Sequence, residues 1–341
     1  MIAFISKRIF SAVLVLFMVG TITFFISHSF PGDPVSLWVG DHPTKEQLEL
    51  ANEKFGFDKP VYQQYFSFLK NISKFDLGVS LRTRQSVSVE LKNRFFATFE
   101  LVFLSMFISL VFGIYLGFFV APRVNTRLDY IVRGVGYLGL AFPIFWLGMI
   151  FQLIFFGLFK WLPLHGRHSG LDSHNNDFVI NEGLFLVTSF FSGEWFVFLD
   201  GLEHILLPSL TLSFGVFGLV FRTARSSMID AMSEPFFKTF LAYGFESSEI
   251  ICQSAYKNTL VPISTVSGLS FGFMLGGTFL VETIFDWPGL GHFSVLSVLT
   301  NDFPAIMGVT LLYALVYIII NVIIDILYIY FDPRLRSQVD G

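Results

Sequence analysis

The residues best suited to chemistry lie in one short polar stretch, where histidines stand near aspartates in the sequence. They are His165, His168, Asp172, His174 and Asp177. Imidazole and carboxylate groups are ligands of zinc, so this stretch could be read as a metal site. Polar loops often contain the same residues without binding metal, and we expect no metal here. The single cysteine, Cys252, excludes an internal disulfide bond and a site made of several thiolates, and we interpret it as a small apolar filler.

Two motifs that would bind nucleotide phosphates or catalytic zinc are missing from the sequence. The chain contains no G-x-x-x-x-G-K-[ST] phosphate loop and no H-E-x-x-H zinc motif. We therefore expect no ATP binding of this kind, no catalytic residue and no cofactor, and we interpret the chain as a protein that is not itself an enzyme.

Few ionisable residues interrupt the apolar runs, and such residues are functional candidates by default. Glu100 stands at the outer end of one run, where we expect it to be close to water. Asp325 follows Asn321 by four residues, so both fall on one face of the last run, one turn inside its inner end. They could belong to a transport pathway or make a structural hydrogen bond to a neighbouring helix. The structural role is favoured because a substrate site should lie nearer the middle of the membrane.

The composition indicates that lipid is the solvent of these runs. Hydrophobic residues make up 53% of the 341 residues, and charged residues make up only 14%. The hydrophobic residues include 45 phenylalanines. Soluble proteins carry about 25% charged residues, so too little charge is present to cover a water-facing surface. The formal net charge of −4 gives no indication of nucleic-acid binding.

Six charge-free stretches approach or exceed the roughly 20 residues of a membrane-spanning helix. They are Ile9–Phe30, Leu101–Ala121, Gly134–Phe159, Ile205–Phe221, Leu260–Val281 and Phe303–Ile324. A seventh candidate, Leu184–Leu199, is interrupted by Gly193 and Glu194 and is too short to cross. We expect it to be a hairpin, or a helix that lies on the membrane. The predicted fold is an all-α membrane protein with a bundle of six transmembrane helices.

Lysine and arginine in the loops predict the orientation. The loops Met1–Arg8, Pro122–Arg133, Arg222–Thr259 and Phe331–Gly341 carry Lys7, Arg8, Arg123, Arg127, Arg133, Arg222, Arg225, Lys238, Lys257, Arg334 and Arg336. Most other basic residues lie in the long loop Pro31–Phe95, and long loops cross largely regardless of charge. Both chain termini are therefore predicted to be cytoplasmic.

Residues 31–95 form the predicted extracytoplasmic segment. Thr44 and Gln47 have the spacing of a capping box before a helix that ends at Phe55. A second helix is predicted from Pro60, with Tyr62, Tyr65, Phe66 and Leu69 on one face, and a third after Ser86. This small helical cap is expected to dock on the spans or on a partner such as a delivering protein. The chain then divides into residues 1–30, 31–95 and a permease core at 96–341.

Small residues recur every fourth position along the fifth predicted span. They are Ser264, Gly268, Gly272 and Gly276, with Gly277 next to the last. This spacing lets two helix backbones approach closely. The face could serve close packing alone or form a subunit interface that lines a pathway.

The inner loop 222–259 contains a short apolar helix. Ser233 and Glu234 are predicted to cap it, Pro235 lies in its first turn, and Gly244 ends the helix Phe236–Tyr243. A further helix is predicted to begin at Ser247 or Ser248. The side chains of Phe236, Phe237, Phe240 and Leu241 are more apolar than a water-facing loop needs, which indicates a partner groove.

Short motifs along nearly the whole chain resemble one family. In order they are FPGDP at 30–34, FGFDKP at 55–60, FDLGVSLRT at 75–83, ATFEL at 97–101, WLPLHGR at 161–167, HILLPSLTL at 204–212, FRTARSSM at 221–228, ETIFDWPGLG at 282–291 and NVIIDILYIYFDPRLR at 321–336. The chain resembles the permease subunits of peptide- and oligopeptide-type ABC importers, the first of their two membrane proteins. The resemblance implies a type I ABC importer bundle in the cell inner membrane.

The resemblance also implies a coupling loop at about residues 222–261, which docks into a groove of a cytoplasmic ATPase. KTFLAYG at 238–244 and NTLVP at 258–262 match its glycine and its Leu-x-Pro, whereas Lys238, Thr239 and Phe240 replace the expected acidic and alanine residues. The implied coupling residues are Glu234, Phe236, Phe237, Phe240, Leu241, Gly244, Phe245 and Glu246. The helix-packing or pathway candidates are Ser264, Gly268, Gly272, Gly276, Asn321 and Asp325.

The implied partners are a second, homologous permease, two ATP-binding subunits, an extracytoplasmic solute-binding protein and membrane lipid. The implied cargo is di- and oligopeptides, with oligosaccharides or nickel complexes as alternatives for the same architecture. A secondary carrier is a different class of function, and the scarcity of intramembrane charges disfavours it.

Overall fold

The computed structural model describes residues 2–29, 38–39, 44–47, 49–50, 56, 58–169, 183–251 and 255–331, with side chains for residue 8 and for residues 10–326 of these ranges. Within them the chain is almost wholly helical, and the one β-type contact is an isolated antiparallel bridge between Val79 and Ser86. The predicted all-α fold is confirmed.

Long connections separate α1 from α4 and η2 from α8, and most of the other helices follow one another closely. In chain order they are α1 (Ile2–Ser29), α4 (Val61–Ile72), α5 (Val87–Val120), the 3-10 turn η1 (Ala121–Arg123), α6 (Arg127–Ala141), α7 (Ile144–Phe151), the π-helix η2 (Gln152–Leu158), α8 (Phe185–Phe191), α9 (Trp195–Ser233), α10 (Pro235–Ala242), α11 (Ser247–Ile250), α12 (Tyr256–Ile284), α13 (Leu290–Leu299) and α14 (Phe303–Phe331).

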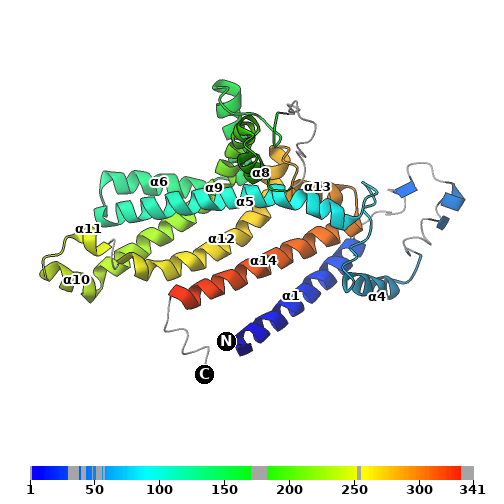
Figure 1. Ribbon diagram of the computed structural model, residues 1–341, viewed down its shortest axis with the longest axis horizontal. Coiled ribbons are helices and arrows are strands. Elements are labelled where there is room, and N and C mark those ends of the chain that lie inside the picture. The colour runs from blue at the N-terminus through cyan, green and yellow to red at the C-terminus, as the bar shows by residue number, and fades with distance from the viewer. Residues whose placement is uncertain are drawn as a thin grey trace.

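Five helices in the described ranges are long and apolar enough to cross a membrane by themselves. They contain the segments Phe10–Ser29, Val87–Arg123, Trp195–Ser233, Tyr256–Ile284 and Phe303–Ile326. Figure 1 shows the bundle lengthwise, with α10 and α11 at one end and α4 and α13 at the other. We refer to these as the α10 end and the α4 end. The chain begins α1 and completes α14 on the side of the bundle toward the α10 end.

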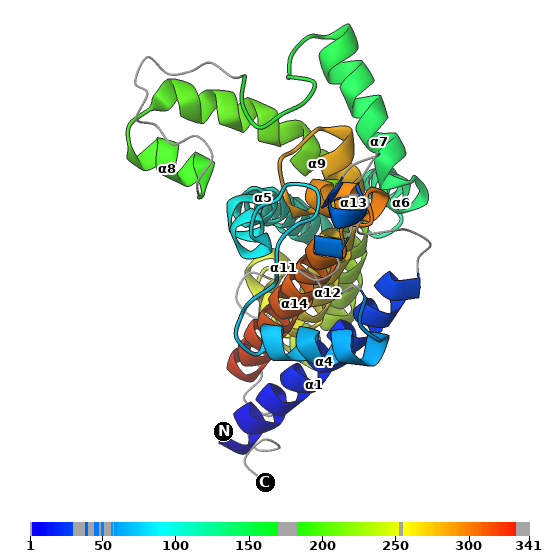
Figure 2. The ribbon, with the colours of Figure 1, turned by 90° about the vertical axis from the view of Figure 1, so that its right-hand side faces the viewer.

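The third predicted span, Gly134–Phe159, is not one straight helix. It is divided into α6 and the α7–η2 helix, which are bent by 110°. The break lies at Phe142, whose φ of −95° and ψ of 141° are extended, and at Pro143. Proline disfavours helical dihedrals in the residue before it and has no N–H to continue the ladder. Figure 2 shows α7 leaving the bundle in a direction of its own.

Helix α9 is the centre of the bundle. It contacts α5, α6, α7, α8, α10 and α12. Glycines bring neighbouring backbones close to it, because a Cβ added at Gly113 or Gly117 of α5 would lie 2.8 Å from Val220 or Ala224. The predicted fourth span, Ile205–Phe221, is therefore the middle of a helix of 39 residues.

The predicted extracytoplasmic segment meets the spans through α4 and α5. Thr44 and Gln47 exchange the two hydrogen bonds of a capping box, at 2.9 and 3.3 Å, whereas much of the predicted helix to Phe55 lies outside the described residues. Helix α4 begins after Pro60, as predicted. The helix predicted after Ser86 is the start of α5, which continues unbroken through residues 95 and 96 into the second span.

The seventh apolar stretch, Leu184–Leu199, is a helical hairpin. Helix α8 packs back on the first turns of α9, and the chain reverses at Gly193, whose φ is +74°. Phe190 contacts Trp195 and Phe198 across the turn, with ring centroids 5.3 and 5.5 Å apart. The break at Gly193 is the reason that this stretch is not a span.

Candidate functional site

Helix α10 ends in a complete Schellman motif. Gly244 has a φ of +88°, and its N–H donates to the carbonyl of Leu241 at 3.0 Å. The N–H of Phe245 donates to the carbonyl of Phe240 at 3.2 Å. The rings of Phe240 and Phe245 also meet edge to face, with centroids 5.4 Å apart, which is the apolar contact that accompanies this motif. Glycine is favoured here because it adopts positive φ without steric cost.

One side of α10 is anchored on its own chain. Phe237 is buried and belongs to an apolar cluster with Ala121, Met228, Ala231, Ile250 and Ala255. This cluster ties α10 to the end of α9, to η1 and to the chain leading into α12. The predicted exposed face of four residues is therefore wrong in part, because Phe237 points inward and Phe236 is half-buried against this cluster.

The other side of α10 exposes an apolar surface, which we call the α10 patch. It consists of Phe240, Leu241, Tyr243 and Phe245, whose exposed fractions are 37%, 42%, 79% and 42%. Glu234 and Glu246 are exposed next to it, at the N-cap positions of α10 and α11. The predicted side-chain caps are absent at these two helices: Ser233 donates to the carbonyl of Ile229, and the cap of α11 is Glu246 rather than Ser247 or Ser248.

A buried ion pair joins the α10 end of α9 to α6. Asp129 is fully buried and accepts from Nε and Nη2 of Arg225 at 2.7 and 2.9 Å. It also accepts from the backbone N–H of Asn125 at 3.1 Å, while its own N–H donates to Thr126 Oγ1 at 3.3 Å. From the sequence, Arg225 was expected only to be one of the charges that set the topology, and Asp129 had no expected role. The Thr-x-x-Asp spacing of a helix start was the available signal.

The small residues of α12 do not share one partner. A Cβ on Gly272 would lie 2.5 Å from Tyr317, and one on Gly268 would collide with Ile324, so both contact α14. Nothing lies within 4 Å of a Cβ added at Gly276, whereas one at Gly277 would meet Leu212 at 3.1 Å. The Ser264 hydroxyl, in turn, donates to the carbonyl of Leu260 in its own helix.

Asp325 and Asn321 have different partners. Asp325 Oδ2 lies 2.7 Å from Nη2 of Arg8, which links α14 to α1. Asn321 donates to the carbonyl of Tyr317 one turn back in α14. The two residues therefore do not form one polar site in this structure.

Glu100 is buried, against the expectation that it lies close to water. Only 6% of its side chain and 5% of that of Arg167 are exposed, and the carboxylate and guanidinium are 2.6 Å apart. Glu100 also accepts from the N–H of Leu186 at 2.9 Å. Glu100 of α5 thus holds two other segments: the connection after η2, through Arg167, and the start of α8, through Leu186.

A further buried carboxylate, to which the sequence patterns assigned no role, organises the turn from α12 to α13. Glu282 accepts from the Thr98 hydroxyl at 2.6 Å and from the N–H of His292 at 2.9 Å. Trp287 is 1% exposed and donates through Nε1 to the carbonyl of Ala97 at 2.9 Å. Ala97 and Thr98 belong to the ATFEL motif and Glu282 and Trp287 to the ETIFDWPGLG motif, so the motifs themselves were the available signal.

Three sequence patterns suggestive of chemistry have no such geometry here. Gly134–Gly139 has the spacing G-x-G-x-x-G and Gly268–Gly272 the spacing G-x-S-x-G, but both lie inside helices rather than after a strand, where these motifs do their chemistry. Of the polar stretch, Asp172, His174 and Asp177 lie outside the described residues. Among those described, no group of three or more metal-ligating side chains occurs.

Sequence comparison identifies the family. Residues 113–337 match the family described as binding-protein-dependent transport system inner membrane component, and residues 1–102 match its N-terminal region. The chain is 38% identical to the "Probable D,D-dipeptide transport system permease protein" of Escherichia coli K12, over 97% of this chain and 96% of that protein.

Two further relatives are equally complete matches. The dipeptide transport system permease protein of Alkalihalophilus pseudofirmus is 32% identical over 98% of this chain and its own full length. The glutathione transport system permease protein of Escherichia coli K12 is 32% identical over 99% of this chain and its own full length. With its apolar helices, this chain belongs to the binding-protein-dependent transport system inner membrane components and is a multi-pass permease subunit of an ABC importer.

Proposed function

We propose that this chain forms, with a second permease, the pathway of an ATP-driven importer of di- and oligopeptides. The names of the relatives support this cargo, since they include dipeptide, D,D-dipeptide and glutathione permeases. Two ATP-binding subunits would hydrolyse ATP, and an extracytoplasmic binding protein would deliver the peptide. The permease would bind and release cargo without forming or breaking covalent bonds.

The α10 patch is the observation that carries this proposal. It presents two phenylalanines, a leucine and a tyrosine to the outside of the bundle, at the end opposite α4. Lipid cannot be the partner if this end lies in the cytoplasm, and water does not favour such a surface. A groove on an ATPase subunit would bury it.

The anchoring of α10 supports a lever mechanism. Phe237 fixes α10 to the ends of α9 and α5, and Arg225 fixes the same part of α9 to α6 through Asp129. A displacement of α10 by the ATPase pair would therefore move α9 and α6 together. Rocking of such helices around a central cavity is a form of alternating access.

Charge substitution in the patch tests the coupling role. We expect Phe240→Asp and Leu241→Asp to reduce co-purification of the ATPase subunits and peptide-stimulated ATP hydrolysis in vesicles, because each places a charge in an apolar contact. Ser226→Asp, on the exposed side of α9, is the matched control and should have little effect. Full assembly and full stimulation in both patch variants would refute the proposed coupling surface.

Thiol labelling tests the proposed orientation, in which the α10 end and both termini are cytoplasmic. Gln85 and Ser247 are exposed on opposite parts of the bundle and can be replaced singly by cysteine in a Cys252→Ser background. An impermeant maleimide added to intact cells or spheroplasts should label residue 85 and leave residue 247 unlabelled until the membrane is opened. The reverse pattern would invert the topology.

A further inference from the structure

Helix α4 contacts the first span well inside the apolar length of that span. Tyr65 Oη lies 2.8 Å from Thr21 Oγ1, and Phe68 and Phe24 have ring centroids 5.3 Å apart. Thr21 precedes the end of α1 at Ser29 by about 12 Å, at 1.5 Å per residue. Figure 2 shows α4 lying across α1 rather than continuing along it. This depth and direction are those of a helix at the boundary between headgroups and acyl chains.

The side of α4 that faces away from the bundle is aromatic. Tyr62 and Phe66 are 61% and 65% exposed, and Phe75, just after the helix, is 90% exposed. The neighbouring face of α1 is equally apolar, with Ile22 and Ile26 54% and 53% exposed. Since α1 crosses the bilayer, its exposed apolar side chains lie against lipid, and exposed aromatic residues such as those of α4 are favoured at the membrane interface.

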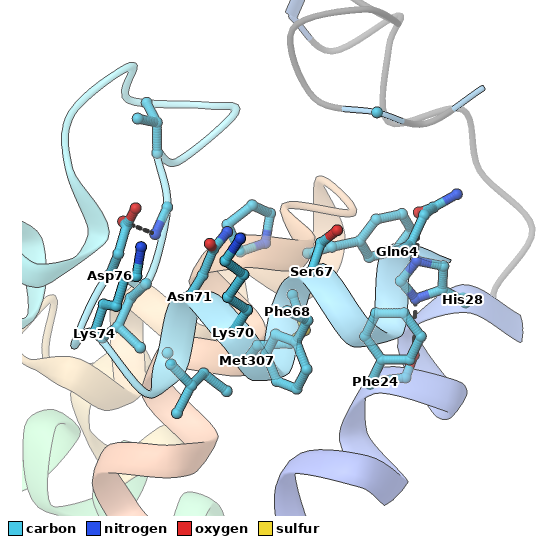
Figure 3. Close-up of a pocket in the computed structure, with 18 of the residues that line it drawn as sticks. Phe24, His28, Gln64, Ser67, Phe68, Lys70, Asn71, Lys74, Asp76 and Met307 are labelled. Carbon is cyan, nitrogen blue, oxygen red and sulfur yellow. Dashed lines mark hydrogen bonds between the residues drawn. The ribbon is translucent and has the colours of Figure 1, made fainter. Parts of the chain in front are cut away.

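A cavity of about 620 Å³ lies between α4, the end of α1 and the start of α14. Its apolar wall includes Phe24, Phe68 and Met307. Figure 3 shows the polar ends of Ser67 and Lys70 on the opposite side of α4 from Phe68 and Met307. The cavity is therefore amphipathic, with polar groups along one edge.

The charged groups that line the cavity are mainly positive. They are Lys59, Lys70, Lys74 and Asp76. The Asp76 carboxylate accepts from the N–H of Gly78 at 2.9 Å, and none of the three lysines forms an ion pair within the described ranges. An occupant that matches both halves of the cavity carries a negative charge and an apolar tail.

We propose that this cavity binds the headgroup of an anionic phospholipid, with Lys70 and Lys74 as the partners of its phosphate. The acyl chains lie along the exposed face of α1 and beside Tyr62 and Phe66. The lipid fills the space between α4 and α14 and holds α4 at the membrane surface. This site is separate from the α10 patch and does not depend on the identity of the cargo.

Photocrosslinking in vesicles tests the proposal. The full-length chain, with the subunits that co-extract with it, is reconstituted with a trace of photoactivatable phosphatidylglycerol or phosphatidylcholine, and labelled peptides are mapped by mass spectrometry. Phosphatidylglycerol should label peptides from residues 58–78 more strongly than phosphatidylcholine does. Lys70→Gln together with Lys74→Gln should reduce this labelling about tenfold, since each lysine near an anionic lipid contributes a several-fold preference.

Two controls distinguish the alternatives. Lys92→Gln, an exposed lysine on α5 outside the cavity, should leave the labelling unchanged. Soluble glycerol phosphate at millimolar concentration should not compete, because it has no acyl chain. Equal labelling by both lipids, unchanged labelling in the double variant, or competition by glycerol phosphate would each overturn the proposed lipid site.

Discussion

Arg225 of α9 donates two hydrogen bonds to the carboxylate of Asp129 of α6, from Nε at 2.7 Å and from Nη2 at 2.9 Å. The carboxylate is fully buried, and 15% of the arginine side chain is exposed. A two-pronged pair of this kind fixes orientation as well as distance. Because α10 follows α9 directly, the pair makes the α10 end of α9 and the start of α6 one mechanical unit.

Removal of one partner should therefore be costly. We expect Arg225→Met or Asp129→Asn to lower the free energy of unfolding by about 3 kcal/mol, because each breaks the bidentate pair at a fully buried carboxylate. The double variant should lose less than the sum of the two single losses. Thermal unfolding of the detergent-solubilised protein measures this, with Arg222→Met, at an exposed arginine of α9, as the control. Additive losses would mean that the two residues act independently.

The glycines of α12 provide a test in which one substitution is made at three positions. Gly268→Leu and Gly272→Leu should destabilise the α12–α14 contact by about 1–3 kcal/mol each, because the added side chain overpacks against Ile324 or Tyr317. Gly276→Leu should be mild, since a Cβ there meets nothing within 4 Å.

Insertion into the membrane should be unchanged in all three variants, because leucine is favourable in lipid. The measurements are expression level, thermal stability and transport, with Phe273→Leu at an exposed position as a further control. If Gly272→Leu and Gly276→Leu behave alike, the contact with α14 has no special packing role.

The pair formed by Glu100 and Arg167 should also respond asymmetrically to substitution. Both side chains are nearly fully buried, so Glu100→Gln or Arg167→Met alone should cost about 3–5 kcal/mol. Replacing both together should be less harmful than either loss alone, because no unpaired charge is left buried. Protection of residues 183–191 from limited proteolysis reports the docking of α8, which this pair supports through Leu186. Equal protection in the wild type and both single variants would contradict this role.

Local signals in the sequence predicted local structure well. The length of each apolar run located five single spans, and glycine after an apolar turn located the end of α10. The break in the third span was also encoded locally, by Phe142 and Pro143, but an apolar window gives no weight to the effect of proline on the residue before it. The apolar run therefore predicted the span but not the break within it.

The long-range pairs could not be derived in the same way. Asp129 and Arg225 are 96 residues apart, and Glu100 and Arg167 are 67 apart. Their pairing depends on which helices become neighbours, and α9 contacts six other helices without a sequence pattern that fixes their order. Likewise, Phe237 and Phe240 are both apolar residues of α10, and only the position of α9 determines which of them is buried.

Gly244 offers the sharpest test of the α10 segment, because its backbone conformation disfavours a side chain whereas the space around it would admit one. Its φ of +88° is unfavourable for other residues, yet nothing lies within 4 Å of an added Cβ in the isolated chain. Gly244→Ala should therefore cost about 1 kcal/mol through the backbone alone, and Gly244→Asn less, because asparagine adopts this conformation more readily. Gly244→Val should cost more, since a β-branched side chain tolerates positive φ poorly.

The matched control for Gly244 is Gly193, in the turn between α8 and α9. Its φ is +74°, and it also has nothing within 4 Å of an added Cβ. Gly193→Ala should thus carry a similar backbone cost without touching the α10 patch. We expect ATPase co-purification and peptide-stimulated hydrolysis to fall in the order Gly, Asn, Ala, Val at position 244 and to remain near the wild-type level in Gly193→Ala. If position 193 produced the same loss of ATPase binding, the effect would reflect general destabilisation, and the left-handed turn at Gly244 would have no specific part in coupling.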